Sequence, residues 1–326
     1  MVTKSEFTFW KGRNVLVTGG AGFIGYALAT KLAAWGARVC VLDIKPSLPT
    51  HAISPHGMRK KITYIRGSVT SKKTVTGILR KKRVQTIFHL AAESIVGRAQ
   101  RDPHICLEAN IKGTWVLLEC ARAVGVSEIL VASSDKAYGS HDELPYQEHA
   151  ALKGLHPYDC SKSCADLIAQ MYAHTFMLPV GIVRSGNVYG SGDTNWSRLI
   201  PDAFRSASRG TTLDIRSDGT FKRDYVYIDD AVDAYMTLAT RVVKDRLHGE
   251  AFNFGNNKPL RVTDVLKELS RVAPKLKYEI LNTAKKEIQH QYLDSSKARR
   301  LLSWRARTSF REGLQKAAAW YTAYFM

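Results

Sequence analysis

The chain has 326 residues, enough to bury a large hydrophobic core in one large domain or two smaller ones. No apolar run of about 18 residues occurs, so a membrane-spanning helix is not expected. The formal net charge of +19 is high, but the basic residues are dispersed without interleaved aromatic side chains, which favours a solvated basic face over a nucleic-acid site. The N-terminus shows no apolar signal core and the five cysteines are odd in number, so we expect reduced thiols and a cytoplasmic location.

Apolar strands alternate with helical segments through the first half of the chain. Strands are expected at 13–18, 38–42, 62–66, 85–90, 128–133 and 180–184, and helices at 23–36, 71–82, 104–124 and 158–176. This alternation predicts a Rossmann-type, doubly wound α/β fold with a parallel sheet. After about residue 186 the pattern loosens, and helices are expected at 198–209, 229–243, 262–273 and 310–324.

A glycine-rich turn joins the first strand to the first helix of this pattern. It contains Gly19, Gly22 and Gly25, and the helix begins at about Phe23. Glycines allow a tight turn and close backbone approach, and the N–H groups of a helix N-terminus suit a pyrophosphate. Asp43 ends the second strand about 20 residues later, where a carboxylate accepts the ribose hydroxyls of NAD and repels a 2′-phosphate. The stretch therefore predicts an NAD site.

Tyr158 and Lys162 lie four residues apart in a predicted helix, so their side chains share one face. An ammonium beside a phenol favours the phenolate, and we expect Lys162 to lower the pKa of Tyr158. Tyr158 then becomes a proton acceptor near neutral pH.

Ser134, Asp135 and Lys136 follow the apolar strand at 128–133 and place a hydroxyl, a carboxylic acid and an amine in consecutive positions. Acid, base and hydroxyl together indicate more than a simple alcohol oxidation. Each residue also has a structural interpretation, as a turn or helix cap for Ser134 and Asp135 and as a solvated charge for Lys136. The glycine-rich turn and the Tyr158/Lys162 pair make the catalytic interpretation the stronger one.

These motifs resemble the extended short-chain dehydrogenase/reductase superfamily, in its nucleotide-sugar epimerase/dehydratase branch. The resemblance rests on Gly19-Gly-Ala-Gly22-Phe-Ile-Gly25, His89-Leu-Ala-Ala-Glu93-Ser94, Tyr158 with Lys162, and Arg184-Ser-Gly-Asn187-Val-Tyr-Gly190. Within that branch the chain most resembles the CDP-glucose 4,6-dehydratases. Its motifs there are Ser134-Asp135-Lys136, His156-Pro-Tyr158, Arg216-Ser-Asp-Gly-Thr-Phe-Lys-Arg223-Asp224-Tyr225 and Glu287-Ile-Gln-His-Gln-Tyr-Leu-Asp294. The likeness covers nearly the whole chain.

The resemblance implies an NAD-binding Rossmann domain at 1–185, to which 225–255 returns, and a smaller nucleotide-sugar-binding lobe at 186–326. It also implies a homodimer in which the helices at 104–124 and 158–176 form a four-helix bundle. The implied cofactor-binding residues are Gly19, Gly22, Phe23, Ile24, Gly25, Asp43, Ser68, Val69, Leu90, Ala91, Ala92, Tyr158 and Lys162. The implied substrate-binding residues are Glu93, Ser94, Asn187, Arg198 and Arg223.

In a dehydratase the resemblance assigns oxidation of the sugar 4-hydroxyl to Tyr158, with Ser134 on the 4-oxygen and Lys162 on the nicotinamide ribose. Asp135 then protonates the departing 6-hydroxyl while a base removes the C5 proton. Lys136 and Glu93 are both candidates for that base. A nucleotide-sugar 4-epimerase would use Tyr158, Lys162 and Ser134 alone, and a non-catalytic Rossmann module that binds nucleic acid is a third alternative.

Two stretches depart from the superfamily pattern. Arg66-Gly-Ser68-Val69 lacks the aspartate that commonly contacts the adenine amine, and His290-Gln-Tyr-Leu-Asp294 lacks an arginine that commonly grips the diphosphate. Arg223 is the candidate to replace that arginine, although an ion pair with Asp224 or Asp229 is an alternative. His89 is expected to end a buried strand without a chemical role, and Cys160 and Cys164 to pack rather than to bind a metal.

Overall fold

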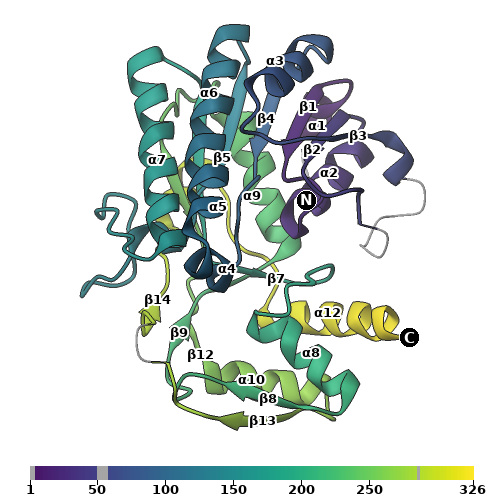
Figure 1. Ribbon diagram of the computed structural model, residues 1–326, viewed down its shortest axis with the longest axis vertical. Coiled ribbons are helices and arrows are strands. Elements are labelled where there is room, and N and C mark those ends of the chain that lie inside the picture. The colour runs from purple at the N-terminus through teal and green to yellow at the C-terminus, as the bar shows by residue number, and fades with distance from the viewer. Residues whose placement is uncertain (1–3, 50–57, 285–286) are drawn as a thin grey trace.

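The computed structural model describes residues 4–49, 58–284 and 287–326 and is built around one seven-stranded parallel sheet (Figure 1). The strand order is β11-β6-β5-β4-β1-β2-β3. The strands are β1 (Asn14–Thr18), β2 (Arg38–Asp43), β3 (Ile62–Arg66), β4 (Thr86–His89), β5 (Glu128–Ala132), β6 (Val180–Ser185) and β11 (Ala251–Phe254). The predicted Rossmann-type fold is confirmed, and the late strand β11 pairs with β6 at the sheet edge.

Helices cover both faces of this sheet because its strands alternate their apolar side chains between two cores. Val15 and Val17 of β1 pack in one core and Leu16 in the other. The first core includes side chains of α1 (Lys4–Trp10), α2 (Phe23–Ala34) and α9 (Ile228–Arg241). The second includes α3 (Lys72–Lys81), α6 (Gly113–Val124) and α7 (Pro157–Phe176). Within the described ranges, no helix combines the length and apolarity needed to cross a membrane.

The C-terminal part adds small sheets and short helices beyond one end of the large sheet (Figure 1). Its strands are β7 (Asn187–Tyr189) paired with β10 (Tyr225–Tyr227), β8 (Thr212–Ile215) paired with β13 (Lys277–Ile280), and β9 (Lys222–Arg223) between β12 (Leu260–Arg261) and β14 (His290–Gln291). Its helices are α8 (Leu199–Arg209), α10 (Val262–Val272) and α12 (Phe310–Phe325), whereas α11 (Ser296–Leu302) packs against β11 and α9 of the first part. The sequence did not predict these two- to four-residue strands, because they are too short to show an alternating pattern.

The helix expected at 104–124 is interrupted. Residues Pro103–Leu107 form α5, a π-helical turn η2 follows at Glu108–Lys112, and α6 begins at Gly113. In the turn, the Asn110 amide donates to the Glu93 carbonyl at 3.1 Å and to Ser161 Oγ at 2.8 Å. A Cβ on Gly113 would lie 2.6 Å from Val69 Cγ1, so the turn also brings the helix close to the loop after β3. π-Turns of this kind are frequent near functional sites.

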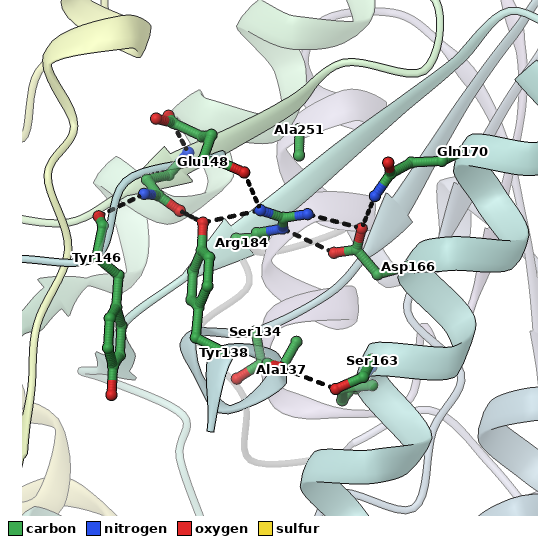
Figure 2. A network of polar contacts seen from close by, with 12 residues as sticks. Ser134, Ala137, Tyr138, Tyr146, Glu148, Ser163, Asp166, Gln170, Arg184 and Ala251 are labelled. Carbon is green, nitrogen blue, oxygen red and sulfur yellow. Dashed lines mark hydrogen bonds and ion pairs between the residues drawn. The ribbon is translucent and has the colours of Figure 1, made fainter. Parts of the chain in front are cut away.

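A buried ion pair joins β6 to α7 beneath the loop that follows β5 (Figure 2). The Arg184 guanidinium donates to both carboxylate oxygens of Asp166, at 2.8 and 2.9 Å, and both side chains are almost fully buried. The same guanidinium donates to the Tyr138 hydroxyl at 2.9 Å and to the Glu148 carbonyl at 2.8 Å. Arg184 therefore fixes the α7 helix relative to the segment that begins with Ser134.

Replacing Arg184 by methionine should lower the free energy of unfolding by about 3–5 kcal/mol, because Asp166 would be left charged and unpaired in the core. The double variant Arg184→Met/Asp166→Leu should recover part of that loss, since it buries no unpaired charge. Urea unfolding of the three proteins measures both quantities. A loss below about 1 kcal/mol for the single variant, typical of exposed pairs, would contradict this account.

His89 ends β4 in the core and bridges two threonines. Its Nδ1 lies 2.8 Å from Thr18 Oγ1 and its Nε2 lies 3.1 Å from Thr114 Oγ1. The Thr114 hydroxyl donates its proton to the Asn110 carbonyl, so Nε2 must be the protonated nitrogen of a neutral ring. Burial, with the charge of Lys162, lowers the pKa of His89 from 6.5 to about 3.

This pKa predicts a specific loss of stability in mild acid. Below pH 6.5 the unfolded chain protonates His89 while the folded chain does not, so stability present above that pH is lost as the pH falls toward 3. At pH 5 the loss amounts to about 2 kcal/mol. Unfolding free energies at pH 7 and pH 5 should therefore differ less in His89→Gln than in the wild type, and equal differences would refute the assignment.

Candidate active site

The glycine-rich turn lies between β1 and α2 and requires glycine at two of its positions. Gly19 has a φ of +71°, and a Cβ there would lie 2.6 Å from the Ala91 backbone nitrogen. A Cβ on Gly25 would lie 2.3 Å from the Gly19 carbonyl oxygen. Gly22 caps α2 without a side chain, which leaves the first-turn N–H groups around Phe23 and Ile24 accessible to a pyrophosphate.

Asp43, at the end of β2, is buried against this turn. One carboxylate oxygen accepts from the Ala21 N–H at 2.9 Å, and the other accepts from the Lys45 N–H at 3.0 Å. Each oxygen keeps a further lone pair for a ribose hydroxyl. The Lys45 ammonium donates to the Ala21 carbonyl at 3.0 Å, so it braces the turn rather than extending toward a 2′-phosphate. The cradle for NAD thus fits the residues present.

The remaining cofactor candidates come from the same edge of the sheet. Leu90 and Ala91 follow β4 and lie against Gly19, and the Ala91 N–H donates to Thr18 Oγ1 at 3.3 Å. Ser68 follows β3, where its hydroxyl bonds Thr70 Oγ1 at 2.8 Å. Ala92, Val69 and Glu93 extend the two loops. These residues lie near one another because they follow the carboxyl ends of parallel strands, which meet at the same edge of the sheet.

Ser134, Asp135 and Lys136 form a tight polar cluster in and just before the short helix η3 (Asp135–Tyr138). Ser134 Oγ donates to Asp135 Oδ1 at 3.0 Å, and the Lys136 ammonium lies 3.1 and 3.2 Å from the two carboxylate oxygens. Asp135 is 1% exposed. Lys136 is half-buried, and desolvation lowers its pKa although Asp135 opposes the change. Lys136 is thus an ion-paired residue and not a freely solvated charge.

Tyr158 and Lys162 occupy one face of α7, with the Lys162 ammonium 6.0 Å from the centre of the Tyr158 ring. The ammonium donates to the Ala132 carbonyl at 2.7 Å, and burial lowers its pKa to about 8. Burial raises the pKa of Tyr158 to about 12, while Arg198 and a hydrogen bond with Ser134 act in the opposite direction. The expectation that Lys162 lowers the pKa of Tyr158 is therefore wrong, because desolvation of the phenol outweighs the effects that oppose it.

The structure places the candidate substrate residues in different surroundings. Glu93 accepts from the Ile95 N–H at 3.0 Å and pairs with Arg98 at 3.2 Å. Ser94 is exposed, and Asn187 lies half-buried on β7. Arg198 pairs with Asp193 at 3.0 Å, and its charge opposes the rise in the pKa of Tyr158.

Arg223 binds backbone instead of a carboxylate. Its terminal nitrogens donate to the carbonyls of Lys222, Gln289 and Ile288 at 2.9, 2.8 and 2.6 Å. No described contact pairs it with Asp224 or Asp229, the partners considered from the sequence. Its charge lies near Lys136 and contributes to the lowered pKa of that lysine. Contact between Arg223 and a diphosphate stays a prediction.

Gln291 was missed by sequence reasoning. It is fully buried on β14, and its amide contacts both Asp135 and Lys136. A glutamine in a two-residue strand carries no recognisable pattern, so nothing in the local sequence could have identified it. Among described residues, no group of three or more histidines, cysteines or acids is arranged to hold a metal ion.

Comparison with known proteins agrees with this geometry. The family model described as the NAD-dependent epimerase/dehydratase family matches residues 15–255. The chain is 30% identical over 324 residues to a trifunctional UDP-glucose 4,6-dehydratase/UDP-4-keto-6-deoxy-D-glucose 3,5-epimerase/UDP-4-keto-L-rhamnose-reductase of Arabidopsis thaliana, covering 95% of this chain and 47% of that protein. The chain thus spans about half the length of the first curated relatives it matches.

Two solved structures illustrate the range of relatives. DesIV, a dTDP-glucose 4,6-dehydratase of Streptomyces venezuelae solved with NAD, is 29% identical with a TM-score of 0.83, covering 95% of this chain and 97% of that one. A UDP-glucose 4-epimerase of Thermotoga maritima solved with UDP-glucose is 27% identical with a TM-score of 0.86, covering 96% and 100%. Fold, NAD cradle and family model agree, and the chain belongs to the NAD-dependent epimerase/dehydratase family.

Proposed function

We propose that this chain is a nucleotide-sugar 4,6-dehydratase. The observation that carries the proposal is the ion pair between buried Asp135 and half-buried Lys136, which contacts Ser134 and whose carboxylate acts on the pKa of Tyr158. Dehydration across C5 and C6 needs an acid for the leaving hydroxyl and a base for the C5 proton. A 4-epimerase needs neither, since it expels no group.

The first half-reaction oxidises the sugar at C4. NAD, when bound, accepts the C4 hydride and later returns it to C6. Tyr158 takes the proton of the 4-hydroxyl and Ser134 donates to the 4-oxygen, while Lys162 is the candidate for the nicotinamide ribose. Because burial raises the pKa of Tyr158 to about 12, its phenolate needs further stabilisation by positive charge before it can accept a proton at neutral pH.

The second half-reaction uses Asp135 and Lys136 as one proton-sharing pair. Transfer of a proton from the Lys136 ammonium to the Asp135 carboxylate gives an amine and a carboxylic acid with no change in net charge. The amine then takes the C5 proton and the acid protonates the departing 6-hydroxyl, so that the C5–C6 double bond forms and water leaves. The ion pair is thereby restored.

Ser134 is proposed to carry the last proton transfer of the cycle, from Tyr158 to Asp135. Return of hydride to C6 requires a proton at C5, which the Lys136 ammonium supplies. Tyr158 then holds one proton more than at the start of the cycle, and the Asp135–Lys136 pair holds one fewer. Ser134 bonds Asp135 Oδ1 at 3.0 Å and Tyr158 as well, so its hydroxyl can pass the proton from the phenol to the carboxylate.

The contacts favour Lys136 over Glu93 as the C5 base. One carboxylate oxygen of Glu93 accepts from the Ile95 N–H and the other pairs with the Arg98 guanidinium, so its contacts lie within its own loop and the helix that follows. Lys136 lies beside the proposed acid, and desolvation already lowers its pKa. Buried lysines with lowered pKa values act as bases in other enzymes.

The second candidate function is a nucleotide-sugar 4-epimerase. It is supported by 29% identity to a UDP-glucuronate 4-epimerase of Thermodesulfobacterium geofontis and by the likeness to the Thermotoga maritima epimerase.

For the substrate, overall sequence likeness favours CDP-glucose, whereas the relatives act on UDP- and dTDP-sugars. Mass spectrometry after incubation with CDP-, UDP-, GDP- and dTDP-hexoses distinguishes the two functions. A product that has lost one water indicates a dehydratase, and a product of unchanged mass with altered retention indicates an epimerase.

We also propose that the two parts of the chain bind different ligands. Residues 1–185 and the returning segment 225–255 bind NAD, and residues 186–326 bind the nucleotide sugar. Arg198, the N-cap residue of α8, and Gln291 of β14 support it, because the charge of Arg198 acts on the pKa of Tyr158 and Gln291 contacts Lys136.

Asp135→Asn should separate the two half-reactions. The amide retains the shape of the carboxylate but cannot protonate the 6-hydroxyl, so elimination should slow by about 10²–10⁴-fold. Oxidation at C4 should survive, and a single turnover should accumulate NADH absorbance together with the 4-keto sugar. Asp142→Asn is the matched control, since that carboxylate is exposed in the loop that follows the same cluster. Full activity of Asp135→Asn without NADH accumulation would favour the epimerase.

We also propose that the chain forms a homodimer through α5, α6 and α7. These helices lie side by side at one edge of the molecule (Figure 1). Large apolar side chains are exposed on them, namely Ile105, Leu107, Trp115, Leu167 and Met171, with exposed fractions between 37% and 54%. A second copy that pairs the same helices would bury this set in a four-helix bundle.

Leu167→Glu should convert the dimer to a monomer, because it places a charge in the centre of the proposed bundle. Sedimentation velocity at micromolar concentrations measures the change. Leu301→Glu serves as the control, since Leu301 is a similarly exposed leucine on α11. A wild-type monomer, or equal effects of the two substitutions, would remove the proposed interface.

A further inference from the structure

Gln291 connects the C-terminal lobe to the catalytic cluster through both ends of one amide. Its side-chain oxygen accepts from the Lys136 ammonium, and its Nε2 donates to the Asp135 backbone carbonyl at 3.1 Å. The residue is fully buried. A buried amide satisfied at both ends has one well-defined orientation, because a flipped amide would put a donor against the ammonium.

The Lys136 ammonium has three N–H bonds, and each of them has an acceptor. Two are the carboxylate oxygens of Asp135, at 3.1 and 3.2 Å, and the third is the Gln291 oxygen. Gln291 therefore supplies the neutral acceptor in this set. Without it, the Lys136 side chain would lose one of the bonds that hold its nitrogen against the carboxylate.

The position of Gln291 is fixed from two sides. On one side β14 pairs with β9, so that Gln291 lies opposite Arg223, whose guanidinium holds the carbonyls of Ile288 and Gln289. On the other side Tyr146 N–H donates to the Tyr292 carbonyl at 3.0 Å, and the Tyr146 carbonyl accepts from Asp294 N–H at 2.9 Å. The segment is thus held between the lobe and the loop that follows η3.

We propose that Gln291 is a positioning residue that holds Lys136 against Asp135 and keeps the two side chains in a proton-sharing arrangement. Its part in elimination rests on the dehydratase function proposed above. A neutral amide is suited to this role, because it orients the nitrogen without forcing it to remain an ammonium. A carboxylate in the same position would stabilise the ammonium and disfavour the amine.

Several charged groups face Lys136 and set the direction of any change. Asp135 of η3 and Asp159 of α7 favour its ammonium, whereas Arg223 of β9 and desolvation disfavour it. Tyr146 contacts Gln291 from the following loop. Against this background, removal of the Gln291 oxygen should lower the pKa of Lys136, and a carboxylate at position 291 should raise it.

The direct test is a pH titration of Lys136 by NMR in the NAD-bound protein. Lysine is labelled with ¹³C at Cε, and the Lys136 signal is identified by its loss in Lys136→Arg. Gln291→Met should lower the Lys136 pKa and Gln291→Glu should raise it, each by about 1–3 pH units. Gln289→Met is the matched control, because that glutamine is two residues away with an exposed side chain. An unchanged Lys136 pKa in both Gln291 variants would overturn the proposal.

Kinetics tests the part of Gln291 in elimination. With the substrate that the wild type dehydrates, Gln291→Met should lower kcat on the order of 10²-fold with little change in KM, since misplacement of a catalytic group affects the chemical step. The basic limb of its pH profile should move to lower pH, and the whole profile of Gln291→Glu to higher pH. A structural role alone would lower activity without moving either limb, and that result would overturn the positioning role.

The experiments distinguish a failure of the dehydratase function from a failure of the role proposed for Gln291. Absence of any dehydrated product from the wild type removes the dehydratase, while the NMR titration still decides whether Gln291 controls Lys136. A wild type that dehydrates its substrate, combined with Gln291 variants that keep the wild-type kcat and pH profile, removes Gln291 and leaves the dehydratase. Circular dichroism and NAD content confirm that each variant is folded and loaded.

Discussion

The arrangement of the site depends on the buried pair between Arg184 and Asp166. Arg184 belongs to a strand of the sheet and Asp166 to the helix that carries Tyr158 and Lys162, so the pair fixes that helix against the sheet. The same guanidinium holds the Tyr138 hydroxyl, and Tyr138 ends the short helix that begins at Asp135. Arg184 thereby holds in place both the helix that carries Tyr158 and Lys162 and the short helix that begins at Asp135. A hydrophobic pair of equal size could give similar stability, but it would not hold Tyr138 and Asp166 by directional bonds.

Burial is the main electrostatic factor within the site, and it acts in opposite directions on the groups it touches. It disfavours the phenolate of Tyr158 and favours the amine forms of Lys136 and Lys162. Positive charge brought to the site by an oxidised nicotinamide would favour the phenolate of Tyr158 and so oppose the effect of burial.

The fold and half of the site were predictable because they rest on local patterns. The strands of the large sheet, the glycine-rich turn and Asp43 each have a characteristic spacing, and the structure places them where those spacings indicated. The surroundings of Lys136 were not predictable. Gln291 lies 155 positions away along the chain, and the strand that carries it has two residues. The assignment of Arg223 as a phosphate fork depended on residue type, whereas the structure shows it bound to backbone carbonyls. Long-range pairing of short segments leaves no periodicity to detect.

The contacts of Arg223 support a role as a brace without excluding the predicted contact with a diphosphate. Its guanidinium donates to the carbonyls of Ile288 and Gln289, and these carbonyls immediately precede the strand that positions Gln291. Together with the bond to the Lys222 carbonyl, these contacts use three of the five N–H donors of the guanidinium. A guanidinium that backbone carbonyls already orient loses little further freedom when it binds a phosphate. The brace and the predicted phosphate contact are therefore compatible, and a phosphate bound there would lie next to the segment that holds Lys136 against Asp135.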